Sequence, residues 1–480
     1  MLVTLRKNTT LFVIAKMSAI ISQMGGLAEA FLSKHAAKLS KNFKNLFIET
    51  LILYVVMQKT NFTQLAAFGS HDEKTYRSHF EKSGVDTVAF NLEMAKGYFE
   101  GSIGIKALAI DPSYISKTGR HTPGLGYFWS GCAGQAKWGH EILGLGIIDT
   151  FRHECFMLGG FQSPNNGMVS SDAIDKQGGY VRYLAGCEAV TDIEHVKSVT
   201  GATVKRPYHK SEVKAEIEKE NPEDEEQRFT FIDWYLYILG SMPPAVYEYT
   251  KRVVADAFFA KKNFVDGLAK LGLKLICRFR DDAALYYLYN GPKTGKPGAP
   301  KKYDGKVDVK NLNMRVFHEI DYSFDGGKCY AGVVYSKSLK QTVKVVIWIS
   351  KDGSKHKIFF SNDLTLAGVD IVKIYRCRFL VEFEFCNAKG FASLEKCQAR
   401  SNNKLRTHFN MSFTSLNCLK VAARESGIPY SISNLKTLVH GQFLMNRFIR
   451  VSGISADSDL ITKLNNEVFS LTTMQMEVVA

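Results

Sequence analysis

The sequence predicts an α/β fold in which a mixed β-sheet is flanked by helices and preceded by an all-helical region. Up to about residue 95, apolar side chains recur at helical spacing, most clearly over residues 46–58. From residue 104 the pattern changes to short apolar runs that are typical of strands. Two of these runs, residues 105–110 and 251–255, are each followed by an aspartate. Functional groups gather at strand ends in sheets that contain parallel strands, so these aspartates are candidate site residues.

Composition favours a globular protein with an anionic partner. The 480 residues are 45% hydrophobic, enough for several domains or for one domain with large insertions. Lysine and arginine outnumber the acids 62 to 47, and this excess favours nucleic acid over mere solubility as its explanation. The odd count of nine cysteines, without zinc-site spacing, indicates reduced thiols. Because no long uncharged apolar segment occurs, we expect a cytoplasmic protein with no membrane partner.

A helix-turn-helix outline is predicted within the N-terminal helices. Residues 61–68 form a short helix with Asn61 as its N-cap, a glycine-containing turn follows, and a second helix begins near residue 72. Lys74, Arg77 and His79 are expected on its exposed face, where the first two would contact DNA. An ordinary helical hairpin is the alternative interpretation.

The middle of the chain alternates between strands and helices. Predicted strands over 125–133, 141–149 and 155–160 form an antiparallel meander. A charge-dense segment over 214–228 follows, either a solvated loop or the start of a helix. Helices over 229–239 and 263–271 and a strand over 273–279 come after it. Residues 290–302 form a basic loop, either a flexible linker or a contact to the DNA backbone. More strands are expected over 311–360 and helices over 367–426.

One predicted helix carries four polar side chains on a single face: Tyr375, Arg378, Glu382 and Lys389. At about 100° per residue, the four Cα positions fall within a wedge of roughly 60°. Apolar residues on the other sides indicate that the helix is largely buried, so its charged groups need partners. Taken alone, Arg378 and Glu382 could be a simple i,i+4 ion pair.

The pattern Tyr-x2-Arg-x3-Glu-x6-Lys resembles the signature of the IS-four-type insertion-sequence transposases, which are DDE enzymes. Asp111 after Ala-Leu-Ala-Ile, and Asp256 after Val-Val-Ala with Phe259 three residues on, resemble the settings of that family's first two catalytic acids. Phe258 and Pro112 depart from its usual pattern, which bears on loop geometry more than on chemistry. The resemblance spans roughly residues 60 to 425.

This resemblance implies an RNase H-like fold and a two-metal site. Asp111, Asp256 and Glu382 would be both the catalytic residues and the ligands of two Mg²⁺ ions, with Mn²⁺ as a substitute. DNA would be bound by Tyr375, Arg378, Lys389 and Arg278. The implied partners are double-stranded DNA, as element ends and target, and a second copy of the chain on that DNA.

The same resemblance divides the chain into five parts. Residues 1–98 form a helical DNA-binding region, and residues 99–284 form the first part of the catalytic core. A basic loop and a β-rich insertion occupy 285–366, and the glutamate helix and the helix after it occupy 367–426. Residues 427–480 are a candidate dimerisation region. The last part contains an apolar stripe that either dimerises or packs on its own domain: Leu460, Ile461, Leu464, Val468 and Leu471.

Alternatives exist for the residues and for the function. Asp149 and Glu384 are rival carboxylates, and Asp111 or Asp256 could simply end a strand in a turn. The predicted function is cleavage at element ends followed by strand transfer. The competing functions are a non-catalytic DNA-binding protein derived from a transposase, and an RNase H-like nuclease without strand transfer.

Overall fold

The structure is a computed structural model that describes residues 20–163, 169–170, 228–292, 301–453 and 463, apart from single positions at 58, 83, 120, 121, 230 and 429. The charge-dense segment 214–228 lies almost wholly outside the described residues, as do the predicted C-terminal stripe and residues 1–19. In the described part, no helix combines the length and the apolar character needed to cross a membrane.

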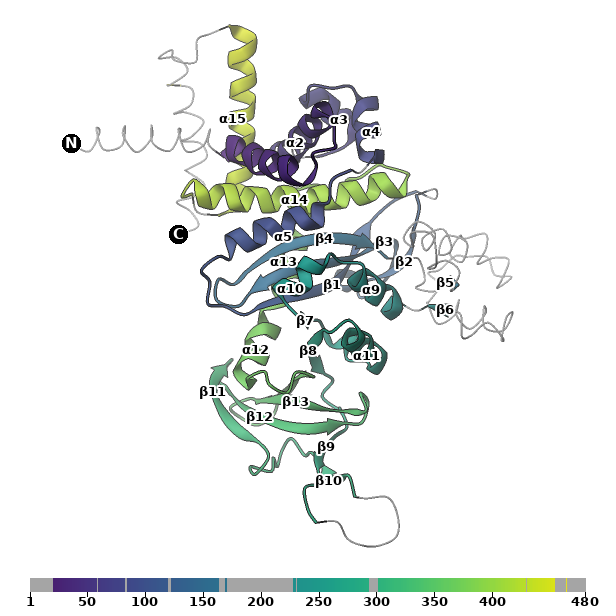
Figure 1. The fold of residues 1–480 in the computed structure, drawn as a ribbon, viewed down its shortest axis with the longest axis vertical. Coiled ribbons are helices and arrows are strands. Elements are labelled where there is room, and N and C mark those ends of the chain that lie inside the picture. The colour runs from purple at the N-terminus through teal and green to yellow at the C-terminus, as the bar shows by residue number, and fades with distance from the viewer. Residues whose placement is uncertain are drawn as a thin grey trace, which may run out of the picture.

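The N-terminal region is helical, as predicted. A helix over residues 20–35 is followed by α2 (Lys41–Val56), α3 (Phe62–Phe68), α4 (Glu73–Lys82) and α5 (Thr87–Tyr98). The predicted N-cap is present, because the Asn61 side chain accepts a hydrogen bond from the backbone N–H of Gln64 at 2.8 Å. These helices form one end of the molecule (Figure 1).

The turn between α3 and α4 is packed more tightly than the sequence suggested. A Cβ atom at Gly69 would lie 1.8 Å from the Tyr76 hydroxyl, so the close approach of α4 requires glycine there. Tyr76 in turn donates to Glu49 of α2 at 2.9 Å. The prediction that His79 is exposed was wrong, since its ring packs against Phe43 and is only 4% exposed. Lys74 is exposed, as predicted.

One 12-stranded mixed sheet runs through the molecule. Its first part consists of β1 (Lys106–Ser116), β2 (Gly126–Ser130), β3 (Gln135–Asp149) and β4 (Glu154–Gln162), with the short helix η1 (Gly131–Ala133) between β2 and β3. β3 is antiparallel to β1, β2 and β4. β7 (Arg252–Val254) lies parallel to β1, and β8 (Lys274–Phe279) lies parallel to β7. A separate two-stranded sheet pairs β5 (Val169–Ser170) with β6 (Arg228–Phe229).

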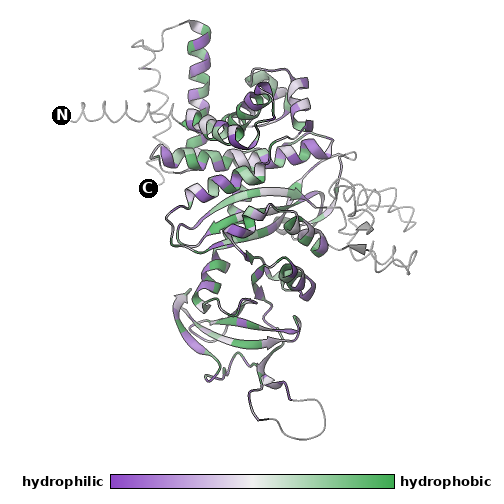
Figure 2. Ribbon diagram, in the orientation of Figure 1, coloured by the Kyte–Doolittle hydropathy of each residue, from purple (hydrophilic) through white to green (hydrophobic). Residues whose placement is uncertain are grey.

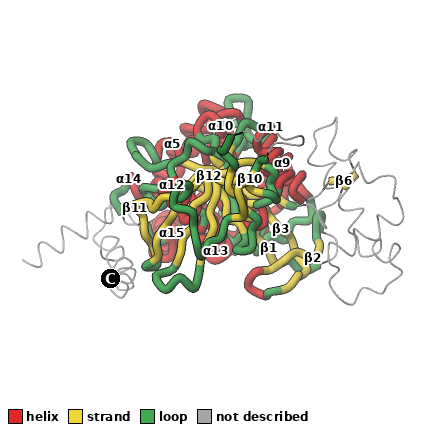
Figure 3. Tube along the Cα trace, turned by 90° about the horizontal axis from the view of Figure 1, so that it is seen from below, coloured by secondary structure: helices red, strands yellow, loops and turns green. Residues whose placement is uncertain are grey.

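The strands expected after the basic loop continue this same sheet beyond β8. They are β9 (Leu285–Leu288), β10 (Tyr303–Lys306), β11 (His318–Phe324), β12 (Gly327–Ser336), β13 (Gln341–Ile349) and β14 (His356–Ser361). β14 pairs with β8, so this part of the chain is joined to the first part by backbone hydrogen bonds. Seen from below, its strands lie in the middle of the molecule with helices around them (Figure 3).

Helices pack on the sheet and on one another. Before β7 in the sequence come α9 (Phe231–Gly240) and α10 (Pro244–Tyr249). After it come the short η5 (Ala257–Phe259) and α11 (Lys262–Lys270). The chain ends with α12 (Gly368–Cys377), α13 (Phe379–Phe391), α14 (Asn402–Glu425) and α15 (Ile432–Ser452). α14 contacts β4 as well as α2, α4 and α5, so it joins the N-terminal helices to the sheet (Figure 1).

The hydropathy of the elements follows this layering. The strands β3 and β4 are strongly apolar, whereas the outer helices carry mixed faces (Figure 2). α14 is buried along most of its length, and its polar residues there are hydrogen-bonded internally, as where Asn417 donates to Asn91 at 2.9 Å. The described cysteines are free thiols, in agreement with the sequence prediction.

Candidate active site

Asp111 lies in the middle of β1 and faces α13. Its direct partner in β3 is Gly144, and opposite residues of an antiparallel pair project from the same face of the sheet. Phe385 of α13 covers Gly144 so closely that a Cβ atom there would lie 2.6 Å from the ring. The prediction that the strand ends on Asp111 was wrong. β1 continues to Ser116 because β3 still pairs with it beyond Ala109, where the pairing with β7 stops.

Asp256 follows β7 and begins η5. Its side chain accepts a hydrogen bond from the backbone N–H of Phe258 at 3.0 Å, and its carbonyl accepts one from the Cys277 thiol at 2.9 Å. The residue therefore has the turn-forming role that the sequence left open as an alternative. Because β7 is the parallel neighbour of β1, the same turn also places Asp256 near Asp111.

The stretch that carries the four-residue signature is two helices and not one. Tyr375 belongs to α12, Glu382 and Lys389 belong to α13, and Arg378 is the junction. At the junction Arg378 N donates to Tyr375 O, and Val381 N donates to Arg378 O, each at 3.1 Å. These i→i+3 bonds tighten the turn relative to an α-helix, which ends α12 while the chain continues in helical conformation.

The Arg378 guanidinium is the centre of the site. Its side chain is 7% exposed, with Nη1 3.1 Å from Asp111 Oδ1 and Nη2 2.8 Å from Glu382 Oε1. The i,i+4 pair weighed from sequence therefore exists, and Asp111 extends it. Asp256 is close enough that Arg378 and Glu382 both influence its pKa. The structure thus brings two of the three predicted carboxylates into contact with one cation and places the third nearby.

The acids of this cluster carry more negative charge than Arg378 balances. Burial raises the pKa of Asp111 to about 7, an effect that Arg378 opposes and that Glu382, Asp256 and Glu141 reinforce. Burial also raises the pKa of Asp256, against the influence of Arg378. Such shifts arise where carboxylates share a poorly solvated space, and a proton or a bound cation relieves them.

The donor set suits a hard divalent cation, although the carboxylates are not arranged around a common point. Carboxylate oxygens are the preferred protein ligands of Mg²⁺, and the excess negative charge favours such an ion. Within the described ranges, no three His, Cys, Asp or Glu side chains lie close enough together to hold a metal. The space between Asp111 and Glu382 is spanned by the Arg378 guanidinium, which would have to withdraw from one of them as a metal bound.

Some of the predicted DNA-binding residues lie beside this cluster. Tyr375 is near enough to Arg378, Arg278 and Asp256 for all three to affect its pKa, which burial raises. Arg278 pairs with Asp281 at 2.9 Å. Lys389 Nζ donates to Ser113 Oγ at 3.0 Å and to Tyr114 O at 2.7 Å, which ties α13 to the extended part of β1.

Lys74 and Arg77 are not brought to the carboxylates. Both lie on α4, beyond α14 from the sheet (Figure 1). Arg77 pairs with Glu73 and lies over the Phe62 ring at 4.6 Å. If these residues bind DNA, they bind it at a distance from the acidic cluster.

The two rival carboxylates have other partners. Asp149 is fully buried, and its Oδ1 accepts hydrogen bonds from the backbone N–H groups of Phe151 and Arg152 at 2.8 Å. Burial alone would raise the pKa of Asp149, but these bonds together with those from the Ser102 and Lys106 side chains lower it, so Asp149 anchors a turn. Glu384 pairs with Lys420 of α14 at 2.7 Å on the other side of α13 from Glu382.

Lys420 was not predicted from the sequence as a residue near the site. Its signal was a lone charge, since between Arg406 and Arg424 the helical run contains no other lysine, arginine, aspartate or glutamate. A charge in such a setting indicates a buried ion pair, but the sequence does not reveal its partner.

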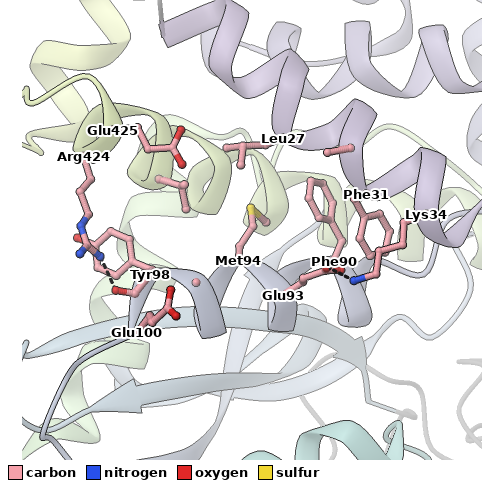
Figure 4. A pocket seen from close by; sticks show the side chains of 13 residues that line it. Leu27, Phe31, Lys34, Phe90, Glu93, Met94, Tyr98, Glu100, Arg424 and Glu425 are labelled. Carbon is pink, nitrogen blue, oxygen red and sulfur yellow. Dashed lines mark hydrogen bonds and ion pairs between the residues drawn. The ribbon is translucent and has the colours of Figure 1, made fainter.

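A cavity of about 570 Å³ lies among the helices, and neither Asp111, Asp256 nor Glu382 lines it. Figure 4 shows it between the helix over residues 20–35, α5 and α14, with Phe31, Phe90 and Met94 on its walls. Its rim includes the Lys34–Glu93 ion pair at 2.6 Å. None of the predicted site residues lines it.

A known protein family matches the region that contains Asp256, Arg378 and Glu382. Residues 229–418, less than half of the chain, match the family model described as Transposase DDE domain. This match supports a DDE transposase. The matched segment contains Asp256, Arg378 and Glu382, whereas Asp111 precedes it. A comparison with curated proteins gives no match.

Proposed function

We propose that the chain is the transposase of an insertion sequence of the IS-four type, which cleaves DNA at the element ends and joins the freed 3′-hydroxyl to target DNA. One observation carries this proposal: Asp111 of β1 and Glu382 of α13 both pair with Arg378, and Asp256 in the turn after β7 lies close enough for Arg378 and Glu382 to influence its pKa. Their order along the chain is that of the acids in the family that the sequence resembles, and Glu382 stands within the Tyr-x2-Arg-x3-Glu-x6-Lys pattern. The transposase-domain match over residues 229–418 supports the same activity.

The roles of the residues follow from their chemistry. Asp111, Asp256 and Glu382 would hold two Mg²⁺ ions, with Mn²⁺ as a substitute. When bound, the ions supply Lewis acidity and a water or hydroxyl of lowered pKa. Arg378 would exchange a carboxylate for a phosphate oxygen of DNA, a partner that suits its planar fork equally well. Tyr375, Lys389 and Arg278 would hold neighbouring phosphates by a hydroxyl and by charge.

The arrangement of the chain supports the remaining parts of the proposal. Antiparallel β4, β3 and β1 followed by parallel β7 and β8 is the order expected of an RNase H-like core. Strands β9–β14 stand where the family carries its insertion, between the last core strand and the glutamate helix. Lys74 and Arg77 on α4 would track the DNA backbone outside the catalytic centre. Two copies of the chain would pair the two element ends.

The test uses duplex DNA that carries the sequences flanking the gene, with a supercoiled plasmid as target. With Mg²⁺, the protein should cut at the element ends, leave 3′-hydroxyls and yield joined products. Glu382→Gln should abolish both steps and retain DNA binding, while Glu248→Gln, an exposed acid on α10, should leave both intact. Cleavage that survives Glu382→Gln contradicts the assignment, and cleavage without joining identifies a nuclease.

A non-catalytic DNA-binding protein is the second candidate, and one observation favours it. Arg378 pairs directly with both Asp111 and Glu382, as in a purely structural ion network. That function predicts DNA binding without cleavage in both Mg²⁺ and Mn²⁺. It also predicts that Glu382→Gln changes stability alone.

A further inference from the structure

We infer that Lys420 is a positioning residue that, through Glu384, holds α13 in the rotation that turns Glu382 toward Asp111 and Asp256. The inference rests on the proposed function, since it matters only if Glu382 binds a metal. It concerns the buried side of α13, which the family signature does not include.

The Lys420 ammonium group has three oxygen atoms around it, two of which accept hydrogen bonds. Nζ lies 2.7 Å from Glu384 Oε1, 2.9 Å from Glu154 Oε2 and 2.8 Å from the carbonyl oxygen of Cys155. The charge is therefore paired with two carboxylates, and two of the three N–H donors are hydrogen-bonded, although the side chain is only 2% exposed. The three contacts join α14, which carries Lys420, to α13 and to the start of β4.

Glu384 and Glu382 occupy opposite sides of the same helix. Two residues apart in an α-helix means a separation of about 200° around the axis. The Glu384 side chain is 8% exposed and the Glu382 side chain is 41% exposed. Turning the helix so that Glu384 moves toward solvent would therefore turn Glu382 away from its present direction.

A second contact makes the rotation of α13 well defined. Phe385 fits above Gly144 of β3, and its ring meets Phe413 of α14 edge-on at 5.5 Å. Phe385 locates the helix over the sheet, and the Lys420–Glu384 pair fixes its rotation. Glycine at position 144 is what allows the ring to approach, because a Cβ atom there would lie 2.6 Å from it.

Removing Lys420 should change the orientation of α13 more than it changes the packing of α14 on β4. Without the ammonium, Glu384 would be a buried carboxylate lacking its cation, which is strongly unfavourable. The simplest relief is rotation of α13 until Glu384 reaches water. Replacing both charges removes that drive, so the combined change should be milder than the loss of Lys420 alone.

The experiment measures Mn²⁺ binding to the full chain by electron paramagnetic resonance, without DNA. The variants are Lys420→Met, Glu384→Gln and the two combined. Asn91→Ala is the matched control, because Asn91 bonds to Leu158 and Thr414 and so links α5, β4 and α14 within the same layer. Melting temperatures are recorded for all, and Glu382→Gln reports whether α13 carries a metal ligand.

Lys420→Met should raise the Mn²⁺ concentration for half-saturation about 10- to 100-fold, the range usual for outer-shell partners of metal ligands. Glu384→Gln should raise it less, and the combined variant should recover part of the loss. Asn91→Ala should lower the melting temperature and leave Mn²⁺ affinity unchanged. If Lys420→Met shows no cooperative melting, Glu384→Gln decides.

Two failures are distinguishable. If Glu382→Gln removes Mn²⁺ binding while Lys420→Met and Glu384→Gln keep the affinity of the unaltered protein, the positioning role is wrong and the proposed function stands. If Glu382→Gln itself leaves Mn²⁺ binding unchanged, α13 carries no metal ligand, and the proposed function fails together with the inference.

Discussion

Asp111→Asn should make the metal-free protein more stable at neutral and alkaline pH, although it should abolish cleavage. The reason is the raised pKa of Asp111, which moves from its usual 3.8 to about 7 through burial and the neighbouring carboxylates. A carboxyl whose pKa is raised in the folded state resists ionisation there and ionises freely in the unfolded chain. Its favourable contribution to folding is complete below the unfolded pKa and is lost as pH rises through the folded pKa.

The magnitude follows from the two pKa values. Each unit of difference corresponds to about 1.4 kcal/mol, so ionisation of Asp111 should reduce the free energy of unfolding by about 1.7 kcal/mol at pH 5 and about 4 kcal/mol at pH 8. Asparagine has no charge to bury and can still accept from Arg378 Nη1. The Asp111→Asn variant should gain stability by these amounts, less whatever is lost as the Arg378 pairing weakens.

Urea denaturation in EDTA at pH 5 and at pH 8 measures the effect. Asp266→Asn on α11 is the control, since it removes an exposed acid paired with Lys262 and should change stability by well under about 1 kcal/mol. The reasoning is refuted if Asp111→Asn is no more stable than the unaltered protein at pH 8. It is also refuted if the gain is equal at the two pH values.

Three further predictions concern packing, protonation and DNA. Gly69→Ala should destabilise the protein by about 1–3 kcal/mol in thermal melting, because its Cβ would collide with the Tyr76 hydroxyl, whereas Gly97→Ala in α5, with open space around it, should stabilise it slightly. His408 has a pKa that burial lowers to about 4, so stability should fall by up to about 3 kcal/mol as pH drops from 6.5 toward 4, and His408→Gln should flatten that dependence in urea titrations. Lys74→Ala should weaken DNA binding regardless of sequence and reduce the salt dependence of affinity by about one phosphate contact, and an unchanged slope in fluorescence anisotropy would count against α4 as a DNA-contacting helix.

Local features of this chain were predictable because they depend on neighbours in sequence. The Asn61 cap needs only its own side chain and the third N–H group after it. Glu382 and Arg378 stand four residues apart, so helical geometry alone brings them within contact. The strand patterns are equally local. The helices α3 and α11 and the strands β4 and β8 were identified to within about two residues at each end.

Features that depend on distant partners were not predictable to the same degree. β1 runs past Asp111 because β3, about thirty residues later, goes on pairing with it. His79 is buried because Phe43 of another helix covers it, although its place in α4 suggested exposure. The split at Arg378 replaces i→i+4 by i→i+3 hydrogen bonds, and nothing in the hydrophobic period marks that change. In each case the deciding contact lies outside the window that a sequence pattern samples.

The two sides of α13 show why a signature motif describes only part of a site. Glu382 and Lys389 lie on the side that the motif includes, where a carboxylate cluster lowers stability and a ligand would recover it. Glu384 lies on the side that the motif omits, and its partner there is Lys420 of α14. A metal ligand must be held in direction as well as in position, and direction is fixed by the buried side of its helix. A chain can therefore contain the complete family pattern and still have the glutamate helix incorrectly oriented. The contacts of Glu384 distinguish a correctly oriented helix from an incorrectly oriented one.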